Sequence, residues 1–284
     1  MSIKFIAEVS SNHSRDIDRA IKFIDLASDA DCDAVKFQLF KIDQLFASEI
    51  LKKSKEHNDR KNWELPTDFL PILSQRCKEK NIEFSCTPFY LDAVNELEPY
   101  VDFYKVASYE LLWDELLIAC ALTGKPVIIS TGMANMKEIK HAVDVLRNNG
   151  CEPKVLHCIS SYPAPFEQAN LSAIETIRKE FNCETGWSDH TVNAGVIHRA
   201  IHKWDAKIIE FHLDIEGKGE EFNSGHCWLP SDISTLISSI RNASAADGNG
   251  IKEPVPSEMP DRLWRTDPSD GLRPFKSIRD NFKL

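Results

Sequence analysis

The stretch Gly186-Trp187-Ser188-Asp189-His190-Thr191 is followed by a second histidine, in Ile208-Ile209-Glu210-Phe211-His212-Leu213-Asp214. Each histidine stands at the end of a β-rich run, and a segment with apolar residues at helical spacing separates the two runs. In a parallel barrel, the carboxyl ends of neighbouring strands converge on one mouth. The spacing therefore predicts two imidazoles close together at the mouth of a barrel.

Outward from this stretch, β-rich runs and helical patterns alternate eight times. Eight such units in 284 residues predict a (β/α)8 TIM barrel over residues 1–246. The alternative, a doubly wound open sheet, usually has a glycine-rich turn after its first strand, and Ser10-Ser11-Asn12-His13 is not one. The expected strands are Lys4–Val9, Ala34–Phe40, Glu83–Pro88, Phe103–Ala107, Pro126–Thr131, Lys154–Ser160, Glu184–His190 and Lys207–Asp214.

Two segments fall outside this alternation. Residues 41–64 are long and charged, which indicates either an elaborated loop on the catalytic face or a solvated excursion. After Ala246 the composition shifts to proline and glycine. We expect residues 247–284 to form an extended C-terminal tail, because so short a segment is too small for an ordinary domain.

Composition excludes several classes of protein. A net charge of −10 and a pI near 5.4 argue against a nucleic-acid-binding surface. No apolar run approaches the roughly 18 residues of a membrane helix, and Glu8 with the polar residues after it is unlike a signal peptide. The eight cysteines form no CxxC pair. A reduced, cytoplasmic protein is therefore expected.

The strand ends carry lysines, hydroxyls and imidazoles. Lys36 and Gln38 are two residues apart and share one face of their strand. Buried lysines need anionic partners, which are either structural carboxylates or the phosphate and carboxylate groups of a small substrate. His190 and His212 could together hold one divalent metal, or each could be an ordinary polar residue. Asp189 could orient His190 or cap the next helix.

Eight ordered motifs span nearly the whole expected barrel, and any one alone would be weak. The motifs are Ile6-Ala7-Glu8 with Asn12-His13; Ala34-Val35-Lys36-Phe37-Gln38; Ser85-Cys86-Thr87-Pro88-Phe89; Tyr104-Lys105-Val106-Ala107-Ser108; Ser130-Thr131-Gly132-Met133; Tyr162-Pro163-Ala164-Pro165; Gly186 to Thr191; and Glu210-Phe211-His212. Together they resemble the sialic acid synthases, which are phosphoenolpyruvate-dependent synthases of nine-carbon sugar acids.

The resemblance implies a reaction. Carbon 3 of phosphoenolpyruvate attacks the aldehyde of an open-chain acetamido sugar such as N-acetylmannosamine, water adds at carbon 2, and phosphate leaves by C–O cleavage. His190 and His212 match the family's ligands for a divalent metal, manganese first, with magnesium or cobalt as alternatives. Glu8 matches a carboxylate near the reacting carbons and is the candidate for proton handling. Residues that match positions holding phosphoenolpyruvate are Lys36, Thr87, Lys105, Ser108, Ser130 and Ser188, and Gln38 and Tyr162 match acceptor-side contacts. Ser160 is a further candidate for substrate binding, although the family often has asparagine at Ser160 or Ser161.

Two departures from the family concern the acceptor sugar. An aspartate that usually contacts it is replaced within Asn223-Ser224-Gly225-His226, with Glu220, Glu221 or Asn223 as substitutes. We also expect the chain to lack the family's small C-terminal antifreeze-like domain, which lends an arginine to the partner's acceptor site. Either the tail covers the mouth with Arg265 or Arg273, or it packs elsewhere. The resemblance allows a homodimer.

Two other functions stay open from the sequence. A Schiff-base barrel aldolase or lyase acting on sialic-type acids would use Lys105 or Lys36 and has no need of paired histidines. A non-catalytic sugar-binding relative would bind without turnover. The retained phosphoenolpyruvate-side residues favour the synthase, for which phosphoenolpyruvate and an aldose acceptor are the expected partners.

Overall fold

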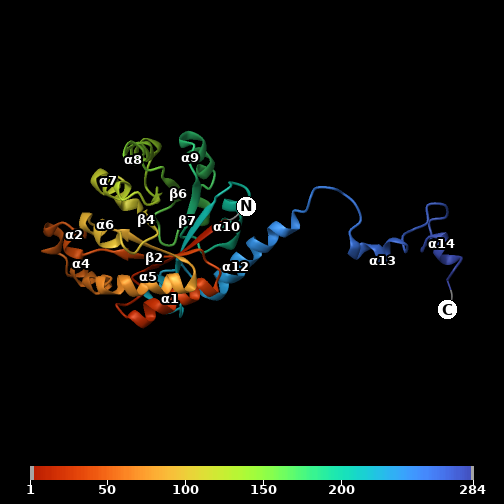
Figure 1. Cartoon of the computed structure of the whole chain (residues 1–284), viewed down its shortest axis with the longest axis horizontal. Coiled ribbons are helices and arrows are strands. Elements are labelled where there is room, and N and C mark those ends of the chain that lie inside the picture. Colours follow the sequence, from red (N-terminus) through yellow and green to blue (C-terminus); the bar gives the residue numbers. More distant parts are fainter. Residues whose placement is uncertain (1–2, 283–284) are drawn as a thin grey trace. The chain divides into compact units, whose positions relative to one another are not determined.

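The sheet is a closed parallel barrel. The computed structural model describes residues 3–282, and its first eight strands pair in sequence order, with β1 also pairing β8. Helices surround these strands on the outside (Figure 1). A two-residue strand, β9, pairs with β8. The predicted (β/α)8 barrel is confirmed. The strands are β1 Lys4–Ser10, β2 Ala34–Leu39, β3 Glu83–Pro88, β4 Phe103–Val106, β5 Val127–Ser130, β6 Lys154–Cys158, β7 Thr185–Asp189, β8 Ile208–Leu213 and β9 Cys227–Trp228.

One main helix follows each barrel strand and buries its apolar face against the barrel wall. In α8, for example, Ile139, Val143 and Leu146 are buried at helical spacing, and Asn135 caps the first turn through a capping box. The main helices are α1 Ile17–Asp29, α5 Leu70–Lys80, α6 Leu91–Leu97, α7 Asp114–Leu122, α8 Met136–Asn148, α9 Ala173–Phe181, α10 Ala194–His202 and α12 Pro230–Ala243.

The barrel interior changes from apolar to polar along the strands. A small apolar cluster fills its lower part and consists of Ile6, Ala34, Phe103, Ile128, Leu156 and Ile208. Because side chains on one face of a strand recur every second residue, the next positions on that face are polar. Ile6 leads to Glu8, Phe103 to Lys105, and Ile208 to Glu210. The strands therefore place a layer of ionisable groups directly above a dry core.

The charged segment after β2 is folded rather than irregular. It contains three short helices and a 3₁₀ turn, namely α2 Ile42–Leu45, α3 Ser48–Leu51, α4 Lys55–Asp59 and Arg60–Trp63. Arg15, in the loop after β1, donates from Nη1 to the carbonyls of Lys61 and Glu64 at 3.0 and 3.3 Å. This contact ties the segment to the loops at the carboxyl ends of the strands, which agrees with the first of its two predicted placements.

The chain divides into two compact units, Met1–Asn242 and Ala243–Leu284. The second unit has two single-turn helices, α13 Met259–Arg262 and α14 Lys276–Arg279, and most of its side chains are exposed. An ion pair between Arg279 and Asp270 (2.7 Å) and an edge-on contact between Trp264 and Phe282 hold it locally. None of the helices within residues 3–282 has the length and apolar character needed to cross a membrane.

Candidate active site

Every residue that the sequence assigned to substrate or metal lies at, or within four residues after, the carboxyl end of a barrel strand. The residues within strands are Glu8, Lys36, Gln38, Thr87, Lys105, Ser130, Ser188 and His212, and those just after a strand are Ser108, Ser160, Tyr162 and His190. Most are buried, whereas Tyr162 is 42% exposed. The structure therefore gathers the whole set at one mouth.

Two buried lysines and two buried carboxylates form the floor of this mouth. Lys36 is ion-paired with Glu8, and its Nζ lies 3.2 Å from Thr87 Oγ1 and 3.9 Å from Glu210 Oε2. Lys105 Nζ lies 3.4 Å from Glu210 Oε1. The lysines thus have structural carboxylate partners, one of the two interpretations that the sequence left open. A substrate anion would enter a site whose charges are already balanced.

Hydrogen bonds fix both carboxylates. Glu8 Oε1 accepts from Gln38 Nε2 at 2.8 Å and from the backbone N–H of Ser10 at 2.9 Å. Glu210 Oε1 accepts from the Ser188 hydroxyl at 3.0 Å, and its Oε2 is buried without a hydrogen-bond partner among the described residues. A buried acceptor with unused capacity marks a place where a ligand donor or water fits.

The two lysines differ in acidity. Burial lowers the pKa of Lys36, but the carboxylates of Glu210 and Glu8 outweigh burial and raise it. Burial also lowers the pKa of Lys105, and Glu210 offsets this only in part, so the Lys105 pKa stays below its usual range. The two carboxylates therefore favour the charged form of Lys36, whereas burial makes proton loss easier at Lys105 than at an exposed lysine.

A cradle of small groups lies beside the lysines, after β4, β5 and β6. The backbone N–H of Gly132 donates to Ser108 Oγ at 3.0 Å, and Ser108 Oγ lies 3.4 Å from Cys158 Sγ. A β-carbon at Gly132 would stand 2.1 Å from Ser160 Oγ, so only glycine fits here. The hydroxyls of Ser130 and Ser160 are buried and unpartnered within the described part of the chain. Unused donors around a backbone N–H suit phosphate oxygens.

His190 and His212 lie together, with ring centroids 5.4 Å apart. His190 Nδ1 is 2.7 Å from the carbonyl oxygen of Ile159. A carbonyl cannot donate, so Nδ1 carries the proton and Nε2 keeps its lone pair. Burial, followed by neighbouring His212, lowers the pKa of His190 to about 3, which keeps the ring neutral. A neutral imidazole with one nitrogen held by a second group is typical of a metal ligand, so this pair fits a divalent ion.

Tyr162 packs over His190, with ring centroids 4.2 Å apart. Asp189 does not join the histidines. Asp189 accepts from Trp187 and Trp228 and from the turn at Thr191 and Val192, so neither of its two predicted roles is seen. The helix cap after β7 is Asn193 instead.

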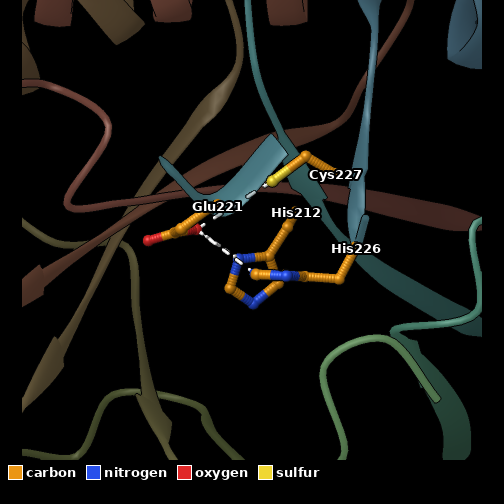
Figure 2. A group of neighbouring side chains, drawn as sticks. All are labelled: His212, Glu221, His226 and Cys227. Atoms are coloured by element: carbon orange, nitrogen blue, oxygen red, sulfur yellow. Dashed lines mark hydrogen bonds and ion pairs between the residues drawn. The ribbon is translucent and has the colours of Figure 1, made fainter. Parts of the chain in front are cut away.

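Sequence reasoning did not assign metal-ligand roles to three residues beside His212. Glu221 Oε2 lies 3.0 Å from His212 Nδ1 and 3.6 Å from His226 Nε2, and Cys227 Sγ is 4.0 Å from the same oxygen (Figure 2). The sequence suggested Glu221 only as a substitute for the acceptor-binding aspartate. The signal that could have found the group is the adjacent His226-Cys227 pair, two ligand types 14 and 15 residues after His212.

A cavity of about 430 Å³ opens beside Glu221. The loop after β1, the folded segment after β2 and the loop after β8 line it. Its polar lining includes Ser11, Asn12, Arg19, Asn62 and Glu220, and Trp63 adds an aromatic wall. Ser11 Oγ donates to Glu221 Oε1 at 3.2 Å, which links this cavity to the imidazoles.

Fold and site together define a (β/α)8 barrel with ionisable groups gathered at the carboxyl ends of its strands, the usual place for chemistry in this fold. The family profile described as NeuB family matches residues 23–252. The chain belongs to the NeuB family.

Several known proteins are similar to this chain. An N,N'-diacetyllegionaminic acid synthase of Campylobacter jejuni is 32% identical over 268 residues, covering 89% of this chain and 80% of that protein. A protein of Methanocaldococcus jannaschii is 38% identical over 259 residues, covering 89% and 74%. The solved sialic acid synthetase of Leptospira borgpetersenii superposes with a TM-score of 0.79 at 31% identity, covering 95% of this chain and 93% of that one. These matches support a sialic acid synthase-like function.

Proposed function

We propose that this chain condenses phosphoenolpyruvate with an open-chain acetamido aldose, N-acetylmannosamine or a related sugar, to give a nonulosonic acid and inorganic phosphate. The observation that carries the proposal is the buried floor of Lys36 and Lys105 beside a cradle of unpartnered hydroxyls. Cations and oriented donors at one place suit a small molecule with both a carboxylate and a phosphate. The family match agrees with this assignment.

In the proposed reaction, carbon 3 of phosphoenolpyruvate bonds to the aldehyde carbon, and the aldehyde oxygen becomes a hydroxyl. Water bonds to carbon 2 and loses a proton, and the C–O bond to phosphate breaks. Lys105 would pair with the incoming anion, which would raise the pKa of its ammonium group. Glu8 pairs in register with His212 of the neighbouring strand, which favours it as the base for the water proton.

His190 and His212 are the proposed holders of a divalent metal, manganese first. When bound, such an ion draws electron density from the aldehyde oxygen and so assists attack on the aldehyde carbon. The hydroxyls of Ser108, Ser130 and Ser160 would hold the phosphate, and Ser188 would keep Glu210 in place. Gln38 and Tyr162 are the proposed acceptor-side contacts.

The cavity beside Glu221 is the proposed place for the far end of the acceptor. Its hydroxyl and amide groups can bind sugar hydroxyls, and Trp63 can pack on an apolar sugar face. Glu221 would then take the place of the aspartate that the family uses.

The direct test measures phosphate release from phosphoenolpyruvate across a panel of aldoses, with and without manganese. We expect release only with an acetamido sugar, and loss of release with a chelator. No release with any acceptor would favour a non-catalytic sugar-binding relative.

A Schiff-base lyase is the second candidate, because the lowered pKa of Lys105 is what an amine nucleophile needs. Borohydride trapping with pyruvate separates the two functions. A covalent adduct at Lys105 would favour the lyase, and chelator-sensitive phosphate release without an adduct would favour the synthase.

A further inference from the structure

Four metal-binding side chains meet at the end of β8. His212 comes from the strand itself, Glu221 from the short helix α11 Glu220–Asn223 in the following loop, and His226 and Cys227 from the start of β9. Their candidate ligand atoms all lie within 4.8 Å of one another, and Figure 2 shows the side chains turned toward a common point. His212 and Cys227 are direct partners in the β8–β9 ladder, so backbone pairing fixes this part of the group.

Glu221 brings a negative charge into this group. Its side chain is 18% exposed, and among residues 3–282 its recorded ion pairs are with the imidazoles of His212 and His226. A carboxylate largely removed from water is costly unless a cation or several donors compensate it. A divalent ion would compensate this charge and would use the nearby sulfur as well.

The spacing suits a small tetrahedral ion. Ligand atoms about 2.0–2.3 Å from a zinc-type ion stand roughly 3.3–3.8 Å apart in a tetrahedron. The recorded separations are 3.0 Å between Glu221 Oε2 and His212 Nδ1, 3.6 Å to His226 Nε2 and 4.0 Å to Cys227 Sγ. Adjustments below 1 Å would bring these three pairs to that geometry.

We propose that His212, Glu221, His226 and Cys227 bind one divalent ion of the zinc and cobalt class. A set with two imidazoles, one carboxylate and one thiolate favours such ions over magnesium or manganese, which prefer oxygen ligands. This ion would lie at Nδ1 of His212 without His190 as a ligand, and it would be separate from the ion proposed at the His190–His212 pair. A catalytic use of this ion rests on the proposed function. Binding of the ion does not, and it can be tested without turnover.

The test is cobalt titration of the full chain after removal of metals by a chelator. We expect intense visible absorption, typical of tetrahedral cobalt, and a near-ultraviolet band from thiolate-to-cobalt charge transfer. Cys227→Ser should remove the near-ultraviolet band and keep visible absorption, whereas Cys151→Ser, the matched buried thiol, should change neither. His226→Ala should abolish the tetrahedral visible spectrum.

His190→Ala separates this site from the His190–His212 pair. We expect this variant to keep the charge-transfer band. A wild-type chain that binds cobalt without that band, or a band that persists in Cys227→Ser, would overturn the proposal. These outcomes differ from a failure of the proposed function. Phosphate release with manganese but no charge-transfer band would contradict only the cobalt site. A charge-transfer band without phosphate release would contradict only the synthase activity.

Discussion

Lys105 Nζ lies 3.4 Å from Glu210 Oε1 at the floor of the barrel mouth, and both side chains are more than nine-tenths buried. Lys36 also approaches Glu210, but it has Glu8 as a second anionic partner. Lys105 has no other carboxylate among the ion pairs of the described residues. Glu210 therefore balances the charge that the proposed substrate would otherwise meet.

Replacing Glu210 with glutamine should leave Lys105 without its anion. Because removal of one partner of a buried ion pair is costly, we expect the free energy of unfolding to fall by about 3 kcal/mol. Phosphoenolpyruvate should raise the melting temperature of Glu210→Gln more than that of the wild type, since it supplies the missing anion. Urea and thermal unfolding with and without phosphoenolpyruvate measure both effects.

The matched control is Glu184→Gln, which breaks a half-exposed pair with Lys154 at the other end of the barrel. Such pairs are worth about 0–1 kcal/mol. Equal stabilisation of Glu210→Gln and wild type by phosphoenolpyruvate would contradict an anion site at Lys105.

Replacing Gly132 with alanine should damage the hydroxyl cradle. The added β-carbon would stand 2.1 Å from Ser160 Oγ and 2.9 Å from Ser108 Oγ. Because both are ends of small side chains, we expect the barrel to survive and the affinity for phosphoenolpyruvate to fall at least about tenfold. Isothermal titration measures this affinity. Gly195→Ala, on a helix with only a 3.2 Å neighbour, should bind like wild type, and equal affinities in all three chains would refute the cradle.

The barrel could be predicted because its strands are marked by local patterns. Predicted and observed ends of Glu83–Pro88 coincide, and most other strand ends differ by one residue. The larger difference is at β6, which ends at Cys158 instead of Ser160. Beyond Cys158 the chain no longer pairs with the neighbouring strands, and Ser160 lies beside Gly132. The mouth residues were predictable for the same reason, since alternate strand positions face the barrel interior and the surrounding helices.

The group around Glu221 could not be predicted from such patterns. The loop after β8 has no periodic pattern, and tertiary contacts hold it: Ser11 Oγ donates to Glu221 Oε1 at 3.2 Å, and Arg19 Nη1 lies 3.0 Å from Glu216 Oε1. The short strand Cys227–Trp228 is too brief to give a signal of its own. Residues 41–64 were equally hard to interpret, because short helices with mixed charge resemble solvated loops.

Replacing His212 with alanine should abolish phosphate release while the barrel stays folded. His212 is a ligand in both proposed metal sites, the pair with His190 and the group with Glu221. It lies at the end of β8, above the apolar core. We expect at least about a hundredfold loss of turnover, because a metal would no longer assist attack on the aldehyde. His202→Ala, at the end of α10, is the control. Wild-type turnover in His212→Ala would overturn both metal assignments.

Removing the second unit tests whether the tail contributes to the acceptor site. The last residue of the hydrophobic core within the described chain is Ile240, so a chain ending at Asp247 should keep the melting temperature of the barrel within a few degrees. If Arg265 or Arg273 binds the acceptor, the KM for the sugar should rise and the KM for phosphoenolpyruvate should not. Unchanged constants for both substrates would show that the tail has no part in catalysis.

Stability should depend on pH through His13, which is fully buried in the loop after β1. Burial, followed by the charge of Arg15, lowers the pKa of His13 from 6.5 to about 4. The unfolded chain therefore binds a proton between these pH values that the folded chain does not. Stability is complete above pH 6.5 and falls as the pH decreases toward 4. Between pH 7 and pH 5 we expect a loss on the order of 2 kcal/mol from this group.

The His13→Asn variant isolates this contribution. An asparagine oxygen can accept the backbone N–H of Arg15, which His13 Nδ1 accepts at 3.0 Å, but asparagine does not titrate. Urea unfolding at pH 7, 6 and 5 should show a shallower loss of stability in His13→Asn than in wild type. Parallel curves for wild type and His13→Asn would mean that His13 titrates in the folded chain as it does in the unfolded one.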